Sequence, residues 1–566
     1  MRKPANIVYG LEDSPPPHIT VLNGIQYVGL IAINLVYPLL VFRVADAPLQ
    51  LVANLLAIGM LVLGAGTFLQ VLRLGPVGSG YMCPATFTAT YLGPSLLAAH
   101  VGGLPLVFGM TIFAGVLEMA IAPLLNRLRA IFPPEVSGLV IFIIGLSGGI
   151  AGVRALLGAK ATPVSVEEWW VVGLTLAAMV ALNVWGKGMA RMLCALIGLL
   201  IGYVAAGFAG LIGGSTMLAV EEAPWIGLPA FGQVSWSFDI SFAALFAIAC
   251  VAAAMKAVGT ITVCQRMNDA DWVRPDMRSI TRGVLADGAS TAIAGVSGAL
   301  GTNTSTPAVG LAAATGVASR KVAFAVGVIF LLLGFFPKLP ALLAVMPRAV
   351  IVAAILFAVT FIMINGLQVM SSRMLDARRT LVIGLSIIAG VTVEVFPTLA
   401  AAAPKAASSL VGSSLVFSAL IALALNLLFR LGVKKTATLK VDRAQIDPKK
   451  IEDFMEAQGA AWGARRDVID RARFNLTQSI ETIVDGCEPQ GPLEIGATFD
   501  EFNLDLRVMY SGPPLELPEK RPTNEEIMES EEGQRRLAGF MLRRYADRVA
   551  ASHKGGRSTI LFHFDH

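Results

Sequence analysis

Long apolar stretches, separated by short polar or cationic connections, fill the chain from about residue 20 to about residue 431. Most of them approach the ~20 residues that an α-helix needs to cross the hydrocarbon core of a bilayer. The pattern predicts about fourteen membrane segments, at 20–43, 50–71, 80–99, 105–126, 134–152, 167–184, 190–211, 240–263, 284–300, 306–318, 321–337, 346–365, 380–397 and 410–431. We therefore expect an all-α polytopic membrane domain over 20–431, preceded by a cytoplasmic segment (1–19) and followed by a charged, soluble α+β domain (432–566).

Glycine, proline and small polar residues interrupt two of these segments where they begin. The tenth begins with GALGTNTSTPAVG (298–310), in which an extended piece precedes a half-helix that starts at Pro307. The third begins with GPVGSGYMCPATFTATYLGP (75–94), which repeats that order of residue types. Non-helical backbone at membrane depth requires surrounding protein or a water-filled cavity, and paired broken helices are typical of the substrate sites of secondary transporters. Since the two interruptions lie seven segments apart, we expect two inverted seven-segment repeats.

Composition and charge agree with a membrane protein. Of 566 residues, 55% are hydrophobic and 15% are charged, a balance that excludes an ordinary soluble globular protein. Cationic side chains gather in alternate connections, for example Arg278, Arg282, Arg320 and Lys321, which predicts cytoplasmic termini. Without a recognisable transit or retention signal, the plasma (inner) membrane is the expected location. The five cysteines are scattered without metal-ligand spacing, and no nucleophile–base pair is recognisable, so we predict neither a metal site nor an enzyme.

Residues 20–431 resemble the nucleobase–ascorbate transporter family, also called xanthine/uracil permeases. The resemblance rests on GLAAATGVASR (310–320), on Gln26-Tyr27, on FPPEVSGLVIFIIGLS (132–147) and on GFFPKLPALLAVMP (334–347). It implies a secondary active transporter, often a symporter, for solutes such as xanthine, urate or uracil. It further implies a core of segments 1–4 and 8–11 that moves against a gate of segments 5–7 and 12–14. We also expect a homodimer in the lipid bilayer that couples transport to a proton or sodium gradient, with no bound cofactor and no nucleic-acid partner.

The same resemblance assigns the substrate-binding positions to segments 3, 8 and 10. They are Phe87, which the family uses to stack on a base, and Lys256, Gly259, Thr260, Thr306, Pro307, Ala308 and Gly310, with Thr315 as a helix-packing residue of the signature. Lys256 stands where the family usually has an acid, and Pro307-Ala308 replaces its pair of polar residues. The polar groups that would hold a neutral nucleobase are therefore largely replaced.

Lys256 changes the expected chemistry of the site. A charged lysine only donates hydrogen bonds, and two half-helix N-termini nearby add partial positive charge, so the site suits a purine-like or other organic anion. Two other interpretations remain open. Lys256 is either a structural charge partner of a membrane acid such as Glu118, or a neutral lysine that carries the coupling proton.

The C-terminal domain is predicted to contain helices at 448–459, 467–485 and 525–552 and strands at 493–497, 502–510 and in the closing STILFHFD. This order weakly resembles the ATP-binding fold of histidine kinases. Thr482 and Tyr510 stand where that fold has its Asn and Asp, which favours a non-catalytic regulatory or dimerisation domain. A second class of function also follows, namely a non-transporting membrane sensor that signals through this domain.

Overall fold

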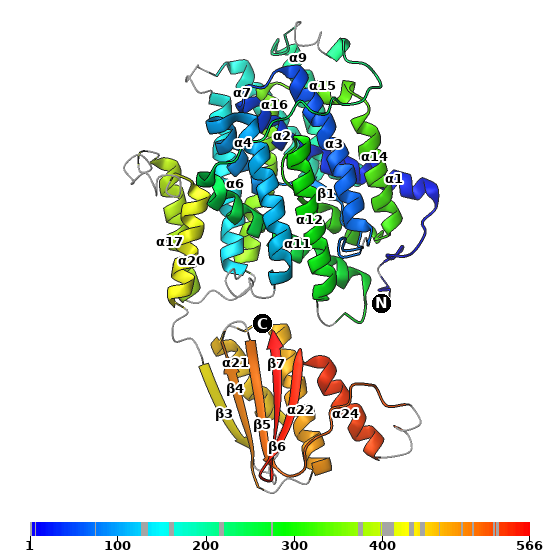
Figure 1. Ribbon diagram of the computed structural model, residues 1–566, viewed down its shortest axis with the longest axis vertical. Helices are drawn as coiled ribbons and strands as arrows, with labels where there is room; N and C mark the ends of the chain where they lie inside the picture. Colours follow the sequence, from blue (N-terminus) through cyan, green and yellow to red (C-terminus); the bar gives the residue numbers. More distant parts are fainter. Residues whose placement is uncertain are drawn as a thin grey trace. The chain divides into compact units, whose positions relative to one another are not determined.

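The chain separates into two compact units, Met1–Met370 with Ile383–Leu423, and Ser371–Val382 with Ala424–His566 (Figure 1). The structure, a computed structural model, describes residues 3–565 apart from 6, 74, 126–133, 158–163, 214–219, 273–274, 372–376, 397, 399–411, 430–434, 442–447, 463, 488–490, 501–502, 524–526 and 528–530. The predicted boundary at 431/432 and both ends of the fourteenth predicted segment lie outside the described residues. Our three-part domain division therefore stays a prediction.

Helices occupy the ranges that the apolar stretches predict (Figure 1). They are α1 (Pro17–Ala32), α2 (Val36–Val44), α3 (Leu49–Val71), α4 (Leu92–Ile121), α6 (Pro134–Leu157), α7 (Val166–Trp185), α8 (Met189–Met192), α9 (Cys194–Phe208), α11 (Ala243–Asn268), α12 (Met277–Ser297), α13 (Thr306–Thr315), α14 (Arg320–Gly334), α15 (Lys338–Ala344), α16 (Arg348–Met370), α17 (Ala377–Val395) and α20 (Ser414–Phe429). Among the described residues, seven helices are long and apolar enough to cross a membrane, or eight if the bent pair α14–α15 is one span. A polytopic helical membrane protein is confirmed, and the count of fourteen stays a prediction.

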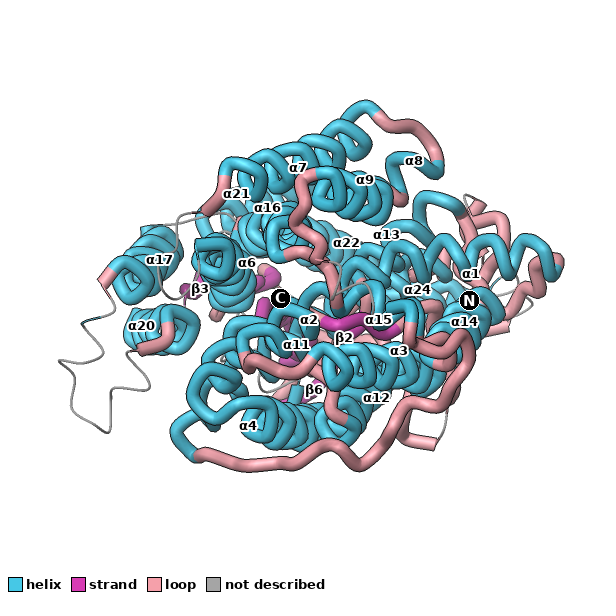
Figure 2. Tube along the Cα trace, turned by 90° about the horizontal axis from the view of Figure 1, so that it is seen from above, coloured by secondary structure: helices cyan, strands magenta, loops and turns pink. Residues whose placement is uncertain are grey.

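Two groups of helices pack mainly among themselves. In one, α12 packs on α3, α4 and α11, and α14 packs on α1 and α3; in the other, α16 packs on α6, α7 and α9. Figure 2 shows α6, α7 and α16 on one side of this unit and α3, α4 and α12 on the other. The division into a core and a gate, and their relative movement, stay predictions.

Glycines allow α4 and α12 to approach until their backbones touch. A Cβ atom added at Gly115 would lie 2.3 Å from the nitrogen of Ala292, and one added at Gly295 would lie 2.6 Å from the nitrogen of Ile112. Small residues at such contacts are the usual way in which membrane helices pack tightly, because lipid offers no hydrophobic drive for helix association. The contact therefore fixes the relative positions of α4 and α12.

Gly115→Leu is expected to separate α4 from α12 and to lower the yield of folded protein. The side chain would collide with backbone, which cannot rotate away as a side chain can, and overpacking of this kind typically costs about 1–3 kcal/mol or more. The measurement is the fraction of monodisperse protein after detergent extraction, together with its melting temperature. Gly173→Leu on α7 is the matched control, because an added Cβ there meets no atom within 4 Å; equal behaviour of both variants would contradict the prediction.

The second unit contains an antiparallel sheet whose strands follow the order β3-β4-β5-β7-β6. Its described elements are β3 (Lys435–Val441), α21 (Pro448–Trp462), α22 (Arg466–Cys487), β4 (Leu493–Phe499), β5 (Asn503–Ser511), α24 (Glu531–Tyr545), β6 (Arg548–Lys554) and β7 (Arg557–Asp565). Alternate residues of β5 and β7, such as Leu506 and Phe562, are buried in a core shared with α22 and α24. Trp462 stacks on Phe499 with ring centroids 5.6 Å apart.

One predicted element of this unit is wrong. The helix predicted at 525–552 ends at Tyr545, and residues 548–554 form the strand β6. Gly555 and Gly556, with φ of 56° and 76°, close a tight hairpin between β6 and β7, and two consecutive positive φ angles are what such a turn requires. The first strand, β3, was not predicted, and Phe502 and most of 524–530 lie outside the described residues.

Candidate functional site

The two interrupted segments meet in the structure. Strand β1 (Ala85–Phe87) pairs with strand β2 (Thr302–Thr304) in antiparallel register, Ala85 opposite Thr304 and Phe87 opposite Thr302. The backbone N–H and C=O groups of these residues lie outside any helix, and they find their hydrogen-bond partners in the other strand. The interior of a membrane requires such pairing because it offers no water to bind them. The extended piece predicted before Pro307 is confirmed, and so is the broken-helix character of both segments.

A helix begins after each strand of this pair. Thr88 caps the short helix η2 (Ala89–Tyr91), which leads into α4, because its Oγ1 accepts a hydrogen bond from the nitrogen of Thr90 at 3.3 Å. Ser305 caps α13, because its Oγ accepts a hydrogen bond from the nitrogen of Ala308 at 3.4 Å. The N-terminal ends of the two helices, with their partial positive charge, therefore lie at opposite ends of one short strand pair.

Helix α11 crosses this strand pair and touches both helix starts. Lys256 and Thr260 are one turn apart on the same helix face. The ammonium of Lys256 donates to Thr88 Oγ1 at 3.5 Å, and Thr260 Oγ1 lies 2.8 Å from Thr306 Oγ1 at the start of α13. Three regions that lie far apart in the sequence, predicted segments 3, 8 and 10, are thereby brought together around Lys256 and Thr260.

Open space lies beside α11 and α13. A Cβ atom added at Gly259 or at Gly310 would meet no atom within 4 Å, and Pro307 is exposed. Thr306 is half-buried, whereas Ala308 is fully buried and does not face this space. Lys256 keeps part of its surface accessible. Open space therefore lies next to Lys256 on α11, at Gly259, and at the start of α13, at Pro307 and Gly310.

Two predicted positions have other surroundings. Phe87 is 1% exposed, and its ring lies against α3, where a Cβ atom added at Gly59 would be 3.1 Å from Phe87 Cζ. The ring supports β1 from behind in this conformation, so stacking on a base would require it to leave Gly59. Thr315 donates to the carbonyl of Leu311 at 2.9 Å, one turn earlier in α13, and Gly316, with φ of 70°, ends that helix.

Asp287 on α12 is a buried acid that our sequence analysis did not single out. Its Oδ2 accepts a hydrogen bond from the nitrogen of Thr304 in β2 at 3.3 Å. Asp287 lies within electrostatic range of Lys256, and no ion pair joins the two side chains among the described residues. An acid inside a predicted membrane segment is a signal of function in itself, and this one could have been found on that ground.

Glu118 on α4 does not pair with Lys256 within the described part of the chain. Its Oε2 accepts a hydrogen bond from the hydroxyl of Tyr91 at 3.4 Å, and the side chain is completely buried. The ion pair that we considered in the sequence is therefore absent from the described structure. Lys256 has its one described hydrogen bond with Thr88.

The N-terminal segment holds the far end of the broken segment 10. The backbone nitrogen of Tyr9 donates to the carbonyl of Gly316 at 3.0 Å, and the backbone carbonyl of Tyr9 accepts from the nitrogen of Ala318 at 2.8 Å. Arg320 forms an ion pair with Glu12 at 2.9 Å and donates to the carbonyl of Gly80, in the connection before β1. The residues VASR of the signature therefore join the N-terminal segment to both broken segments.

A separate cavity of 740 Å³ lies among α6, α7 and α16. Its walls are mostly apolar side chains, such as Leu146, Leu176 and Phe357, with Arg154 and Asn183 among the few polar ones. None of the predicted substrate-binding residues lines it. The cavity therefore belongs to the second group of helices and is distinct from the space beside Lys256.

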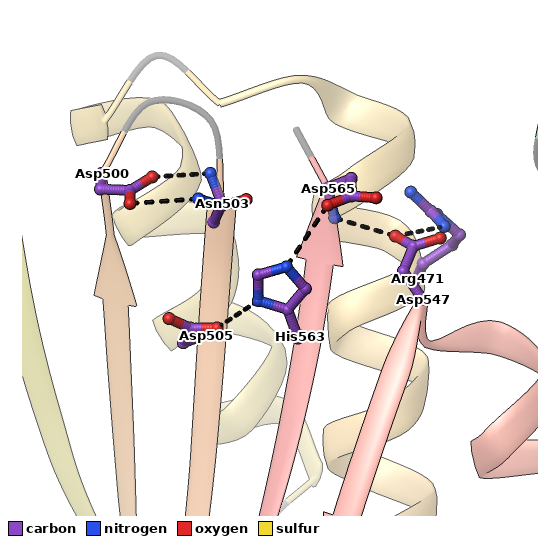
Figure 3. Close-up of polar contacts among 7 residues, drawn as sticks. All are labelled: Arg471, Asp500, Asn503, Asp505, Asp547, His563 and Asp565. Atoms are coloured by element: carbon purple, nitrogen blue, oxygen red, sulfur yellow. Dashed lines mark hydrogen bonds and ion pairs between the residues drawn. The ribbon is translucent and has the colours of Figure 1, made fainter. Parts of the chain in front are cut away.

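Polar contacts in the C-terminal unit join the ends of its strands (Figure 3). The imidazole of His563 contacts Asp505 at 2.6 Å and Asp565 at 3.3 Å, and Arg471 contacts Asp547 at 3.4 Å. The described residues contain no group of three or more potential ligands arranged to hold a metal ion. These contacts hold β5 to β7 and hold α22 to the residue that precedes β6.

Tyr510 occupies the position that corresponds to the nucleotide-binding Asp in the weak resemblance described above. Its hydroxyl donates to the carbonyl of Pro513 and accepts from the nitrogen of Leu515, both at 2.9 Å. The side chain thus organises its own loop. The non-catalytic character of this unit stays a prediction.

Comparison with known proteins decides the family. The xanthine/uracil permease profile, described as "Permease family", matches residues 18–399. The chain belongs to this family. The permease is 30% identical over 431 residues to the uric acid permease PucJ of Bacillus subtilis (strain 168), covering 73% of the chain and 92% of that protein. It is 26% identical over 443 residues to the xanthine permease XanP of Escherichia coli (strain K12), covering 75% of the chain and 95% of that protein.

The permease is therefore a multi-pass membrane transporter and not an enzyme. Among solved structures, it is similar to the murine Solute Carrier 26 family member A9 anion transporter in the inward-facing state. The TM-score is 0.48 at 12% identity, covering 82% of this chain and 83% of that one. The family match ends at residue 399, before α20 and the C-terminal unit.

Proposed function

We propose that this permease transports purine- or pyrimidine-type nucleobases by alternating access, and that it favours solutes that carry a negative charge. The observation that supports this most is the meeting of β1, β2 and α11, where Lys256 and Thr260 each touch the start of a half-helix beside open space. The relatives named above are permeases for uric acid and xanthine, so the substrate class agrees with the family.

Each residue of the site has a role in this proposal. Lys256 supplies the positive charge, and the hydroxyls of Thr260 and Thr306 supply neutral donors and acceptors. Gly259 and Gly310 leave room for a planar ring against α11 and α13. An anion bound there would also be stabilised by the N-terminal ends of η2 and α13.

The proposal extends to the assembly and its movement. The helices around α12 would carry the site past those around α16, and the protein would act as a homodimer in the plasma (inner) membrane with both termini in the cytoplasm. A proton or sodium gradient would drive uptake. The family resemblance supports these parts of the proposal, together with the cationic connections noted in the sequence.

Uptake by proteoliposomes containing the full-length protein tests the function. We expect labelled urate and xanthine to enter faster than uracil at neutral pH, and unlabelled urate to compete with both. Liposomes without protein give the background. Solute that binds to the protein but does not cross the membrane would overturn the transporter proposal and would instead support the membrane-sensor class.

A further inference from the structure

An apolar segment without helix or strand precedes α11, and we call its residues 225–238 the apolar belt. The belt contains no charged residue, and six of its large apolar side chains are exposed, namely Trp225, Ile226, Leu228, Phe231, Trp236 and Phe238. The least exposed of these, Trp236, is still 53% exposed. Neighbouring exposed apolar side chains usually mark a surface that contacts protein or membrane, so the belt calls for a partner.

The first half of the apolar belt is bonded to the end of α14 and to the start of α3. The backbone nitrogen of Gly227 donates to the carbonyl of Phe335, which follows α14, at 3.1 Å. The side-chain amide of Asn54, in the second turn of α3, donates to the carbonyl of Ala230 at 2.8 Å and accepts from the nitrogen of Ala230 at 2.7 Å. These bonds fix this half of the belt to both helix ends.

The second half of the belt is bonded to α12 and α4. The indole nitrogen of Trp236 donates to the carbonyl of Gly295, in the last turn of α12, at 3.1 Å, and the backbone nitrogen of Ser237 donates to the carbonyl of Pro105 at 2.9 Å. Because α4 is kinked at Gly103, Pro105 begins its second half. Two segments thus begin at the belt and two end there, and the cationic connections predict that this is the non-cytoplasmic side.

The belt continues a surface of apolar side chains on these helices. Leu332 on α14, Val296 on α12 and Val116 on α4 are exposed, although all three helices lie in predicted membrane segments. In a multi-pass membrane protein, lipid is the usual neighbour of such side chains. The ring of Phe238 packs on that of Phe113, one turn from Val116, with centroids 5.5 Å apart. A protein partner needs one compact patch, whereas the belt follows the apolar edge of the molecule past four helices.

The backbone of the belt limits the depth at which it can lie. Its described backbone bonds are those of Gly227, Ala230 and Ser237, so its other backbone groups need water. The hydrocarbon core offers no water, and irregular backbone exposed to lipid does not occur there. Bulk water, in turn, is unfavourable for six large apolar side chains. The lipid–water interface satisfies both requirements, and tryptophan is enriched there because its ring is apolar and its N–H is polar.

We propose that the apolar belt lies in the lipid–water interface of the non-cytoplasmic leaflet and binds phospholipid there. Its exposed side chains enter the upper part of the acyl chains, and its backbone faces the water among the headgroups. The ammonium of Lys338 lies 4.2 Å from the centroid of the Trp225 ring, which puts a positive charge beside the belt where lipid phosphates lie. The belt thereby holds the ends of α3, α4, α12 and α14 at one depth in the membrane.

Spin labels on the full-length protein in phospholipid vesicles test this location. A nitroxide is attached at Ile226→Cys or at Phe231→Cys, and its collisions with oxygen, which concentrates in lipid, are compared with its collisions with a water-soluble nickel chelate. We expect a several-fold higher ratio of oxygen to nickel collisions than at Glu222→Cys, an exposed position just before the belt, and a lower ratio than at Val116→Cys on α4. The four described free cysteines are buried, and wild-type protein taken through the same labelling gives the background.

Two results would overturn the lipid contact. A collision ratio equal to that of Glu222→Cys would place the belt in water. Few collisions with either reagent would show that protein covers the belt, either a second copy of this chain or another protein, and not lipid. Both labelled positions are exposed, so the substitutions leave the packing of the helices unchanged.

Quenching of tryptophan fluorescence by brominated phospholipids tests the same contact without a label. The difference between the wild type and the double variant Trp225→Phe, Trp236→Phe isolates the emission of the belt. Bromine near the headgroup end of the acyl chains should quench this emission strongly, and bromine near the chain ends should quench it less. Trp462→Phe is the matched control, because Trp462 stacks on Phe499 in the core of the C-terminal unit and its emission should be quenched by neither lipid. If the emission of the belt is likewise quenched by neither, the belt does not contact phospholipid and the proposal fails.

Discussion

Lys256→Gln is expected to lower the affinity for urate by about 10- to 100-fold and to abolish the preference for urate over uracil. The substitution removes the positive charge that faces the space beside α11 and α13. A hydrogen bond to a charged group contributes about 1.5–3 kcal/mol, and each 1.4 kcal/mol corresponds to about tenfold in affinity. Glutamine keeps a polar, unbranched side chain at this position, so the local packing should be largely kept. The measurement is competition of each solute against labelled urate uptake.

The controls separate charge from packing. Lys256→Arg keeps the charge in a larger side chain and should retain part of the preference for anions. Lys338→Gln removes a lysine near Trp225, away from the site, and should leave the competition profile unchanged. If Lys256→Gln transports urate and uracil with wild-type affinities, Lys256 lies outside the substrate site and serves as the counter-charge of Asp287.

Gly310→Phe should abolish transport and leave the folded protein intact. An added Cβ at Gly310 meets no atom within 4 Å, and the residue lies within α13, where replacing glycine by phenylalanine gains roughly 0.5 kcal/mol of helix stability. The Cβ atom would therefore clash with nothing, and the aromatic ring would fill the space that we assign to the solute. The measurements are urate uptake, melting temperature and the shift of that temperature by urate.

Gly173→Phe is the matched control for steric blocking. Gly173 also has no atom within 4 Å of an added Cβ, but it lies on α7, far from α13 in the sequence and outside the predicted site. This variant should transport normally. Normal urate uptake by Gly310→Phe would show that the solute does not occupy the space beside α13.

Much of the membrane architecture could be predicted because a bilayer imposes simple rules. Apolar stretches of spanning length became helices, and the glycine- and proline-rich starts of two segments became β1 and β2. A break such as that before Pro307 is readable because few sequences tolerate it within a membrane. The roles that we propose for Lys256 and Thr260 come from the family resemblance, and the structure adds that each side chain touches the start of a half-helix.

What the sequence could not provide is pairing between distant residues. Glu118 was noticed as a possible partner of Lys256, yet its hydrogen-bond partner in the structure is the hydroxyl of Tyr91. In the C-terminal unit, the strand β6 was taken for helix because its own pattern is weak, and pairing with β7 determines its conformation. In both cases, contacts between residues far apart in the sequence determine the outcome: the partner of Glu118 and the strand conformation of β6.

The pairing of β1 with β2 has a consequence for biosynthesis. The chain enters the membrane from its N-terminus, so β1 is synthesised long before β2, and more than 200 residues separate Phe87 from Thr302. Until β2 arrives, β1 has unpaired backbone groups that lipid cannot solvate. The first half of the protein must therefore stay in a protein- or water-lined environment until β2 is synthesised, and the backbone of Tyr9 likewise lacks its partner until Gly316 is synthesised. Nascent chains halted before residue 302 should accordingly be held by the insertion machinery instead of being released into lipid.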